Sequence, residues 1–210
     1  RQGLPDINAI QNPIQRLSVE ASLPVWLIET LVEQNGEAKT RQIIGSINDA
    51  PAQAIRVNTV LSTDEAVEQA LLDEHFTFVK SKVADHAYVV TGGHVAGSKA
   101  YQDGLLTLQD ESAMLPVEAL QITTQVKTVL DAAAAPGGKT TQIAQYIADD
   151  ATITALDIHA HKIRLIEANA KRLHVSDKIT AQVLDARQTA NQLTTKFDRI
   201  LVDAPCSGFG

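Results

Sequence analysis

Apolar residues follow two different periods along the chain, and the change between them predicts where helices and strands lie. From Ser22 the sequence SLPVWLIETLVEQNG repeats at helical spacing, with Ser22 as the expected N-cap, Pro24 in the first turn and Gly36 at the end. A second helix is predicted over EAKTRQIIGSIN, so that residues 21–53 form a helical segment. Residues 1–20 are polar and mixed, and they are predicted to be a linker or tail.

The pattern changes to strands separated by a helix over residues 54–110. The stretches AIRVNTV and HAYVVTG are rich in Val, Ile and Thr, which favours strands. Between them, STDEAVEQALLDEH predicts an amphipathic helix in which Ser62 is the N-cap and Glu65 completes a capping box. We therefore expect a small α+β module here.

Strands and helices alternate over residues 111–210, which is typical of a parallel sheet in an α/β fold. Four strands are predicted in VKTVLDAA, ATITALDI, KITAQVLDA and FDRILVDAP, with helices in GKTTQIAQYIA and AHKIRLIEANAKRLH. Each strand ends near an acidic residue: Asp131, Asp157, Asp185 and Asp203. Ligands of open α/β sheets bind at this carboxyl edge, so these four residues mark a candidate site.

Composition limits the class of protein. The chain has 210 residues, 44% hydrophobic and 20% charged, which is ordinary for a globular protein. It contains no run of about 18 apolar residues that would predict a membrane-spanning helix. The net charge of −7 argues against a strongly basic nucleic-acid binder. The single cysteine excludes an internal disulfide and predicts a cytoplasmic location.

The stretch LDAAAAPGGKTTQIA joins a strand to a helix through a glycine turn. A phosphate-binding Walker A loop needs a glycine where this chain has Ala133, and the dinucleotide fingerprint lacks its last glycine. The remaining turn at a helix N-terminus favours a negative group, either a carboxylate or a phosphate. Asp157 follows 20 residues after Gly137, where a carboxylate can hold ribose hydroxyls.

These motifs together resemble those of the RNA cytosine-5 methyltransferases that use S-adenosylmethionine. DAAAAPGGKTTQIA is similar to their first motif, ALDIHAHKIRLIEANAKRLH to their second and DAPCSGFG to their fourth. IRVNT and GLLTLQDESAM are similar to their upstream signatures. Residues 21–37 resemble the segment before that domain in the 16S ribosomal RNA methyltransferases of the Sun or Fmu type. A helical RNA-binding domain precedes this region in that family, so the resemblance implies that residues 1–20 are a linker from a missing N-terminal helical domain. The resemblance implies that residues 111–210 are the N-terminal part of a class I, Rossmann-like methyltransferase domain, truncated after four strands.

The resemblance also implies roles for individual residues. Asp157 would take the ribose hydroxyls, Lys162 would lie near the ribose edge, and Asp185 would meet the adenine. Asp203 would lie between the methyl sulfonium and the target base. The loop beside the methionine part of the cofactor comprises Ala133, Ala134, Ala135, Pro136, Gly137, Gly138 and Lys139. Ala133 stands where the family usually has Cys, a position that contributes mainly backbone.

Cys206 resembles the family cysteine that assists product release, and with Pro205 it would complete the wall beside the base. The attacking cysteine of the family lies in a later Thr-Cys-Ser motif, which this sequence lacks. We therefore expect the nucleophile beyond Gly210 and the 210 residues alone to be catalytically inert. A lone thiol is otherwise often a buried structural group.

The expected partner is RNA, 16S ribosomal RNA or a small-subunit assembly intermediate, with no membrane and no metal. The histidines near Asp157 lack the spacing of a metal site. Arg56, Lys80, Lys82 and Lys99 are candidates for phosphate contacts, although isolated charges are more often plain surface. Two alternatives stay open: a P-loop-like nucleotide hydrolase, and a non-catalytic RNA-binding relative of the methyltransferases.

Overall fold

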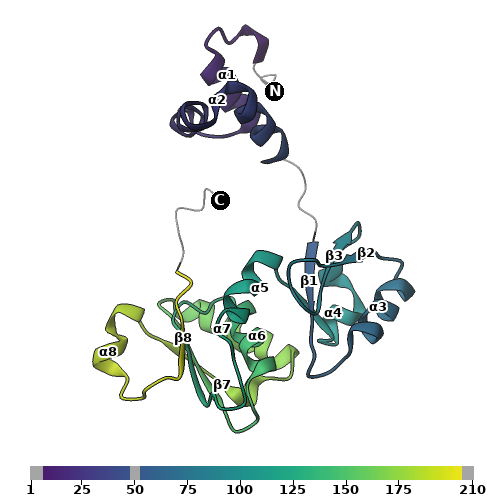
Figure 1. Ribbon diagram of the computed structural model, residues 1–210, viewed down its shortest axis with the longest axis vertical. Helices are drawn as coiled ribbons and strands as arrows, with labels where there is room; N and C mark the ends of the chain where they lie inside the picture. Colours follow the sequence, from purple (N-terminus) through teal and green to yellow (C-terminus); the bar gives the residue numbers. More distant parts are fainter. Residues whose placement is uncertain (1–6, 48–52, 205–210) are drawn as a thin grey trace. The chain divides into compact units, whose positions relative to one another are not determined.

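The computed structural model describes residues 7–47 and 53–204 of the chain. The chain divides into two compact units, residues 1–51 and residues 52–210 (Figure 1). No helix within the described ranges is both long and apolar enough to cross a membrane.

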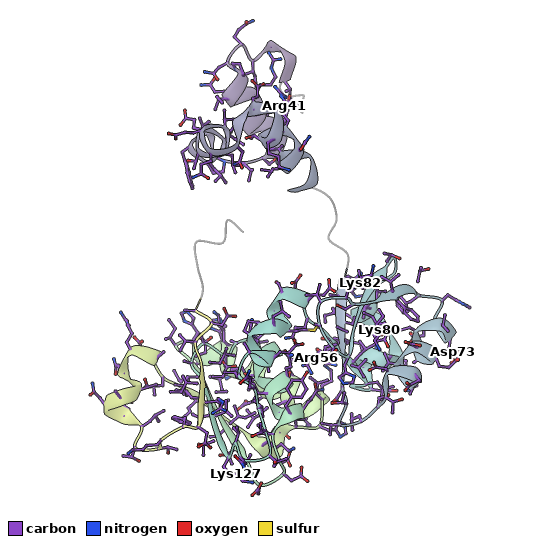
Figure 2. The ribbon with its side chains drawn as sticks, viewed as in Figure 1. Arg41, Arg56, Asp73, Lys80, Lys82 and Lys127 are labelled. Carbon is purple, nitrogen blue, oxygen red and sulfur yellow. The ribbon has the colours of Figure 1, made fainter. Side chains whose placement is uncertain are left out.

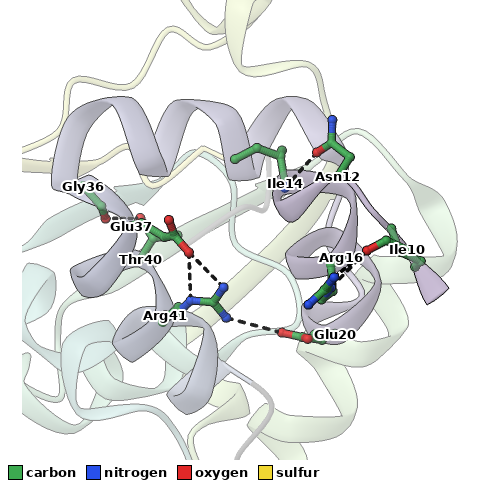
Figure 3. Close-up of polar contacts among 9 residues, drawn as sticks. All are labelled: Ile10, Asn12, Ile14, Arg16, Glu20, Gly36, Glu37, Thr40 and Arg41. Atoms are coloured by element: carbon green, nitrogen blue, oxygen red, sulfur yellow. Dashed lines mark hydrogen bonds and ion pairs between the residues drawn. The ribbon is translucent and has the colours of Figure 1, made fainter. Parts of the chain in front are cut away.

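The first unit is helical and includes a helix that the sequence pattern did not predict. After the short turn η1 (Ile7–Ala9), α1 (Pro13–Ala21) lies inside the stretch predicted to be a linker. Its capping residue is Asn12, whose Oδ1 accepts a hydrogen bond from the N–H of Ile14 (Figure 3). The same oxygen also accepts one from the N–H of Gln15. The helix is only nine residues long and buries two of them, so its apolar stripe is too short to stand out in the sequence.

The second helix of this unit, α2 (Val25–Ile47), is broken where the sequence predicted an end. Gly36 has φ 75° and ψ 161°, which is not helical, and the helix resumes after it. Thr40 and Arg41 then bond back to Gly36 and Glu37 (Figure 3). The predicted cap was misplaced: Ser22 has φ 55° and ends α1 instead of starting α2.

The second unit begins with a four-stranded antiparallel sheet of order β2-β3-β1-β4. Its strands are β1 (Gln53–Val57), β2 (Thr77–Lys80), β3 (Ala87–Thr91) and β4 (Leu106–Leu108). Its helices are α3 (Asp64–Asp73), η2 (Val95–Gly97) and α4 (Lys99–Gln102). The predicted helix is present, but Thr63 caps it instead of Ser62, with Oγ1 accepting from the N–H of Ala66 at 3.3 Å. We call this part the antiparallel module.

Helix α5 (Glu111–Glu118) leads into a parallel sheet of order β7-β6-β5-β8, as the alternation of strands and helices predicted. The strands are β5 (Thr128–Asp131), β6 (Thr152–Asp157), β7 (Ile179–Val183) and β8 (Arg199–Leu201). The remaining elements are α6 (Gly138–Tyr146), α7 (Ala160–Arg172), η3 (Ser176–Lys178), η4 (Ala186–Gln188) and α8 (Thr189–Gln192). This is an α/β, Rossmann-like arrangement, as predicted.

Both faces of the parallel sheet are covered, because alternate residues of each strand point to opposite sides. Val129 and Ile153 belong to a core that includes Ile143 of α6 and Ala170 of α7. The neighbouring Leu130 packs on the other face in a smaller cluster completed by the following residues: Ala132, Leu156, Leu184, Ala186, Leu193 and Phe197. Strand order places β5 between β6 and β8, so the chain reverses direction across the sheet beside the end of β5. Such a switch point is where ligands bind in open α/β folds.

Candidate functional site

A cavity of about 790 Å³ opens at the carboxyl edge of the parallel sheet, within the size range of small-molecule sites. All four acidic strand ends line it: Asp131, Asp157, Asp185 and Asp203. The first turn of α6 and the first turn of α7 contribute two further walls. A third wall runs from the end of β4 into α5 and consists of Leu108, Gln109, Asp110 and Ala113. Every residue predicted to bind cofactor lies on this lining except Gly137.

The loop between β5 and α6 is fixed by backbone contacts, which explains its small residues. The N–H of Ala134 donates to the carbonyl of Leu156 at 2.8 Å, and the N–H of Gly137 donates to that of Ala134 at 2.8 Å. The peptide bond between Ala135 and Pro136 is cis. Gly137 has φ 104°, and a Cβ there would lie 3.1 Å from Cα of Ile166 in α7. A glycine is therefore required both by the backbone angle and by the close approach of α7.

Asp131, at the end of β5, stabilises this loop through a hydrogen bond with α6. It is 1% exposed, and the hydroxyl of Thr140 donates to its Oδ2 at 2.6 Å. Burial raises the pKa of Asp131 above its ordinary value, while the bond from Thr140 opposes that rise. The carboxylate thereby ties the end of β5 to the first turn of α6.

Asp157 presents a carboxylate to the cavity from the end of β6. It is 9% exposed, and its Oδ1 accepts a hydrogen bond from the N–H of His159 at 2.9 Å. Within the described part of the chain, no Lys, Arg or His side chain forms an ion pair with it. A nearly buried carboxylate can accept hydrogen bonds from neutral donor groups of a ligand, such as hydroxyls.

Asp185 lies in the same lining but is already engaged. Its Oδ2 is 2.6 Å from a terminal nitrogen of Arg187, and Nε of that arginine contacts both carboxylate oxygens. Hydrogen bonds from Arg187 lower the pKa of Asp185 to about 2. Sequence analysis did not single out Arg187, and only its place two residues after the acid could have drawn attention to it. The predicted contact of Asp185 with adenine stays a prediction.

Two predicted residues from different elements form an ion pair at the β8 side of the cavity. Nζ of Lys139, in the first turn of α6, lies 2.5 Å from Oδ2 of Asp203. The lysine side chain is 21% exposed and the aspartate 47%, so the pair faces both cavity and solvent. The predicted wall of Pro205 and Cys206 lies outside the described residues.

The first turn of α7 contributes Lys162 and His159 to the lining. The rings of His159 and His161 stack with centroids 5.4 Å apart. In the ranges that the structure describes, no group of three His, Cys, Asp or Glu side chains could hold a metal ion.

The prediction that Arg56 is a candidate for RNA phosphate contacts was wrong. Arg56 is 0% exposed and lies inside the unit, whereas Lys80 and Lys82 of the antiparallel module are exposed (Figure 2). Its guanidinium donates from Nε to Oε1 of Gln109 at 2.9 Å, and Gln109 lines the cavity. The IRVNT stretch indicated a strand and resembled an upstream signature of the family, but neither observation indicated that the arginine is buried.

Comparison with protein families identifies the chain. Residues 118–210 match the model of the 16S rRNA methyltransferase RsmB/F, and residues 23–95 match the ferredoxin-like domain of RsmF/B-like methyltransferases. This chain belongs to the RsmB/F methyltransferase family. The two matched regions cover most of the chain and include the loop, Asp157, Asp185 and Asp203.

Individual RsmB/F relatives agree with this assignment. The chain is 38% identical to the probable ribosomal RNA small subunit methyltransferase B of Bacillus subtilis, over 100% of this chain and 47% of that protein. It is 32% identical to ribosomal RNA small subunit methyltransferase F of Vibrio parahaemolyticus, over 75% of this chain and 34% of that protein. The chain thus spans about half or less of the length of these relatives. The crystal structure of a methyltransferase homolog protein from Pyrococcus horikoshii has a TM-score of 0.80 at 26% identity, covering 95% of this chain and 65% of that one.

Proposed function

We propose that the cavity binds S-adenosylmethionine and that the whole protein methylates carbon 5 of a cytosine in 16S ribosomal RNA. The observation that carries the proposal is the meeting of an unpaired, nearly buried carboxylate and a glycine turn in one cavity of an RsmB/F chain. S-adenosylmethionine would supply the methyl group. A non-catalytic RNA-binding relative is the remaining alternative, whereas family membership disfavours a P-loop hydrolase.

The residues present fit this cofactor. Asp157 has carboxylate oxygens to accept hydrogen bonds from two neighbouring ribose hydroxyls, because only the N–H of His159 occupies it within the described chain. Lys162 lies on the same wall and suits the ribose edge. The N-terminus of α6 favours a carboxylate such as that of the methionine part. The alanine side chains of residues 133–135 leave room beside that turn.

The ion pair of Lys139 and Asp203 lies toward β8, where we place the target base. Cytosine needs a thiolate at carbon 6 before carbon 5 becomes nucleophilic enough to take a methyl group. A base then removes the proton from carbon 5, and the bond between sulfur and carbon 6 breaks as the thiol leaves. We assign the attack to a cysteine beyond Gly210 and product release to Cys206. This assignment makes the 210 residues alone inert.

The RNA partner is inferred from the family, with a small-subunit assembly intermediate as one form of it. Exposed Lys80, Lys82 and Lys99 of the antiparallel module are available to phosphates, whereas Arg56 is not. Lys80 and Lys99 already pair with Asp64 and Asp103, which weakens their attraction for a polyanion. The cytoplasmic location stays a prediction.

Two measurements test the proposal. The chain should bind S-adenosylmethionine in calorimetry, and Asp157→Ala should weaken binding by about tenfold or more, the worth of hydrogen bonds to a charged group. Asp150→Ala is the matched control, because Asp150 pairs with Lys127 away from the cavity. The full-length protein should then transfer radiolabel to unmodified 16S ribosomal RNA as 5-methylcytosine. Absence of cofactor binding, or label on a different atom, would refute the proposal.

A further inference from the structure

Arg56 is a fully buried arginine whose partners are all neutral. Its guanidinium donates to Oε1 of Gln109 at 2.9 Å, to Oγ1 of Thr141 at 3.1 Å and to the carbonyl of Gly138 at 3.3 Å. A fourth bond goes to Oε1 of Gln145. Among the side chains that the structure describes, no carboxylate forms an ion pair with it. Burial accordingly lowers its pKa to about 9.

A buried arginine without a carboxylate partner contributes little net stability to a core. Removing a charge from water is unfavourable, and apolar replacements of buried charges are often neutral or stabilising. What a guanidinium offers instead is a planar fork of five donors with fixed angles. Arg56 uses that fork to hold acceptors from separate parts of the unit in one fixed arrangement.

The parts that Arg56 joins include two walls of the cavity. Gly138 and Gln109 both line it, one from the first turn of α6 and one from the segment after β4. They are also close neighbours, since a Cβ on Gly138 would lie 3.8 Å from Cδ of Gln109. Gln109 is fixed further by bonds from its Nε2 to Gln142 and to the carbonyl of Ala113.

We infer that Arg56 is a positioning residue for the cofactor: it sets the first turn of α6 against Gln109 and thereby fixes the width of the cavity at the glycine turn. This inference rests on the proposed function, because it concerns the same cavity. It assigns Arg56, which lies outside the cavity lining, an effect on cofactor affinity.

Arg172 provides a control for the purely structural role. It also joins the antiparallel module to the parallel-sheet part, from α7 to the carbonyls of Tyr101 and Leu106 at 2.8 and 3.0 Å and to Oγ1 of Thr107 at 2.9 Å. None of these partners lines the cavity. Loss of Arg172 should therefore weaken the same junction while the bonds from Arg56 to Gly138 and Gln109 stay in place.

The test measures two quantities on the chain and its variants: the Kd for S-adenosylmethionine by calorimetry and the midpoint of urea unfolding without cofactor. Arg56→Met and Arg172→Met should both lower the unfolding midpoint. Only Arg56→Met should raise the Kd, by about tenfold or more, and Arg56→Lys should recover part of that loss because lysine donates without the fork. Should Arg56→Met fail to fold, Thr141→Val removes one acceptor of the fork at constant shape and should raise the Kd severalfold.

The outcomes distinguish failure of this inference from failure of the proposed function. A Kd that is unchanged in folded Arg56→Met or in Thr141→Val overturns the inference while leaving the proposed function intact. An equal rise in Arg172→Met also overturns it, since the effect would then follow from general loosening of the junction. If the wild-type chain binds no cofactor, the proposed function and the inference both fail.

Discussion

Gly104 makes the junction between the antiparallel module and α7 sensitive to a single methyl group. Its φ is 75°, and a Cβ at this position would lie 2.0 Å from the carbonyl oxygen of Arg172. That oxygen belongs to backbone, so α7 or the loop must shift by more than 1 Å to reach the roughly 3.4 Å of an ordinary contact. Asn58 would be strained as well, because it bridges the carbonyls of Gly104 and Leu173 at 2.8 and 2.9 Å.

We predict that Gly104→Ala lowers the free energy of unfolding by about 3 kcal/mol. About 1 kcal/mol comes from the left-handed backbone angle, and about 2 kcal/mol comes from overpacking and weakened buried hydrogen bonds. For a unit of this size, the corresponding decrease in Tm is about 6–12 °C. Urea unfolding followed by circular dichroism measures the first quantity, and a thermal scan the second.

Gly92→Ala separates the two contributions. Gly92 has nearly the same φ, 79°, but nothing lies within 4 Å of the added Cβ. This variant should therefore lose only the backbone contribution of about 1 kcal/mol. Equal losses in Gly92→Ala and Gly104→Ala would refute the claim that close packing of this loop on α7 holds the module in place.

Two further predictions concern aspartates of the cavity. Thr140→Val removes the donor to buried Asp131 and should lower the free energy of unfolding by about 1.5–3 kcal/mol at pH 7, measured by urea unfolding. This loss of stability should become smaller in acid as Asp131 becomes protonated. A loss that does not depend on pH would contradict this account. Arg187→Gln should return the pKa of Asp185 from about 2 toward its ordinary 3.8, measured by NMR titration. Because the pKa of Asp185 is lower in the folded chain, the pair of Asp185 and Arg187 stabilises the chain above about pH 4 and loses that effect as the pH falls toward 2. An unchanged titration curve of Asp185 in Arg187→Gln would show that Arg187 does not cause the low pKa.

Local pattern was most informative where strands are buried on both faces. The four parallel strands and the helices α6 and α7 were all predicted, because continuous apolar runs alternating with amphipathic helices have few other folded solutions. Short elements were missed. Helix α1, strand β2 and strand β4 have nine, four and three residues, so their apolar positions are too few to define a period.

Capping residues were placed less accurately for a related reason. Ser22 and Thr63 each lie among several polar residues before a helix. Which of these residues caps the helix depends on backbone angles that cannot be read from the sequence. Ser22 in the left-handed region ends α1, and Thr63 replaces the neighbouring serine as the cap of α3.

By itself, the sequence determined the parallel α/β fold and gathered the candidate ligands at strand ends, since parallel strands necessarily bring their carboxyl ends to one edge. Only the tertiary structure decided which of those residues are free to meet a ligand. Among the residues that the structure describes, Asp157 has no cationic partner and faces the cavity, whereas Asp185 is held by Arg187 and Asp203 by Lys139. Asp185 and Arg187 are only two residues apart in the sequence, whereas the pair of Asp203 and Lys139 depends on a distance between separate elements that no local pattern encodes. The same is true of Arg56, a charge on a strand that only three-dimensional packing places behind the wall of the site.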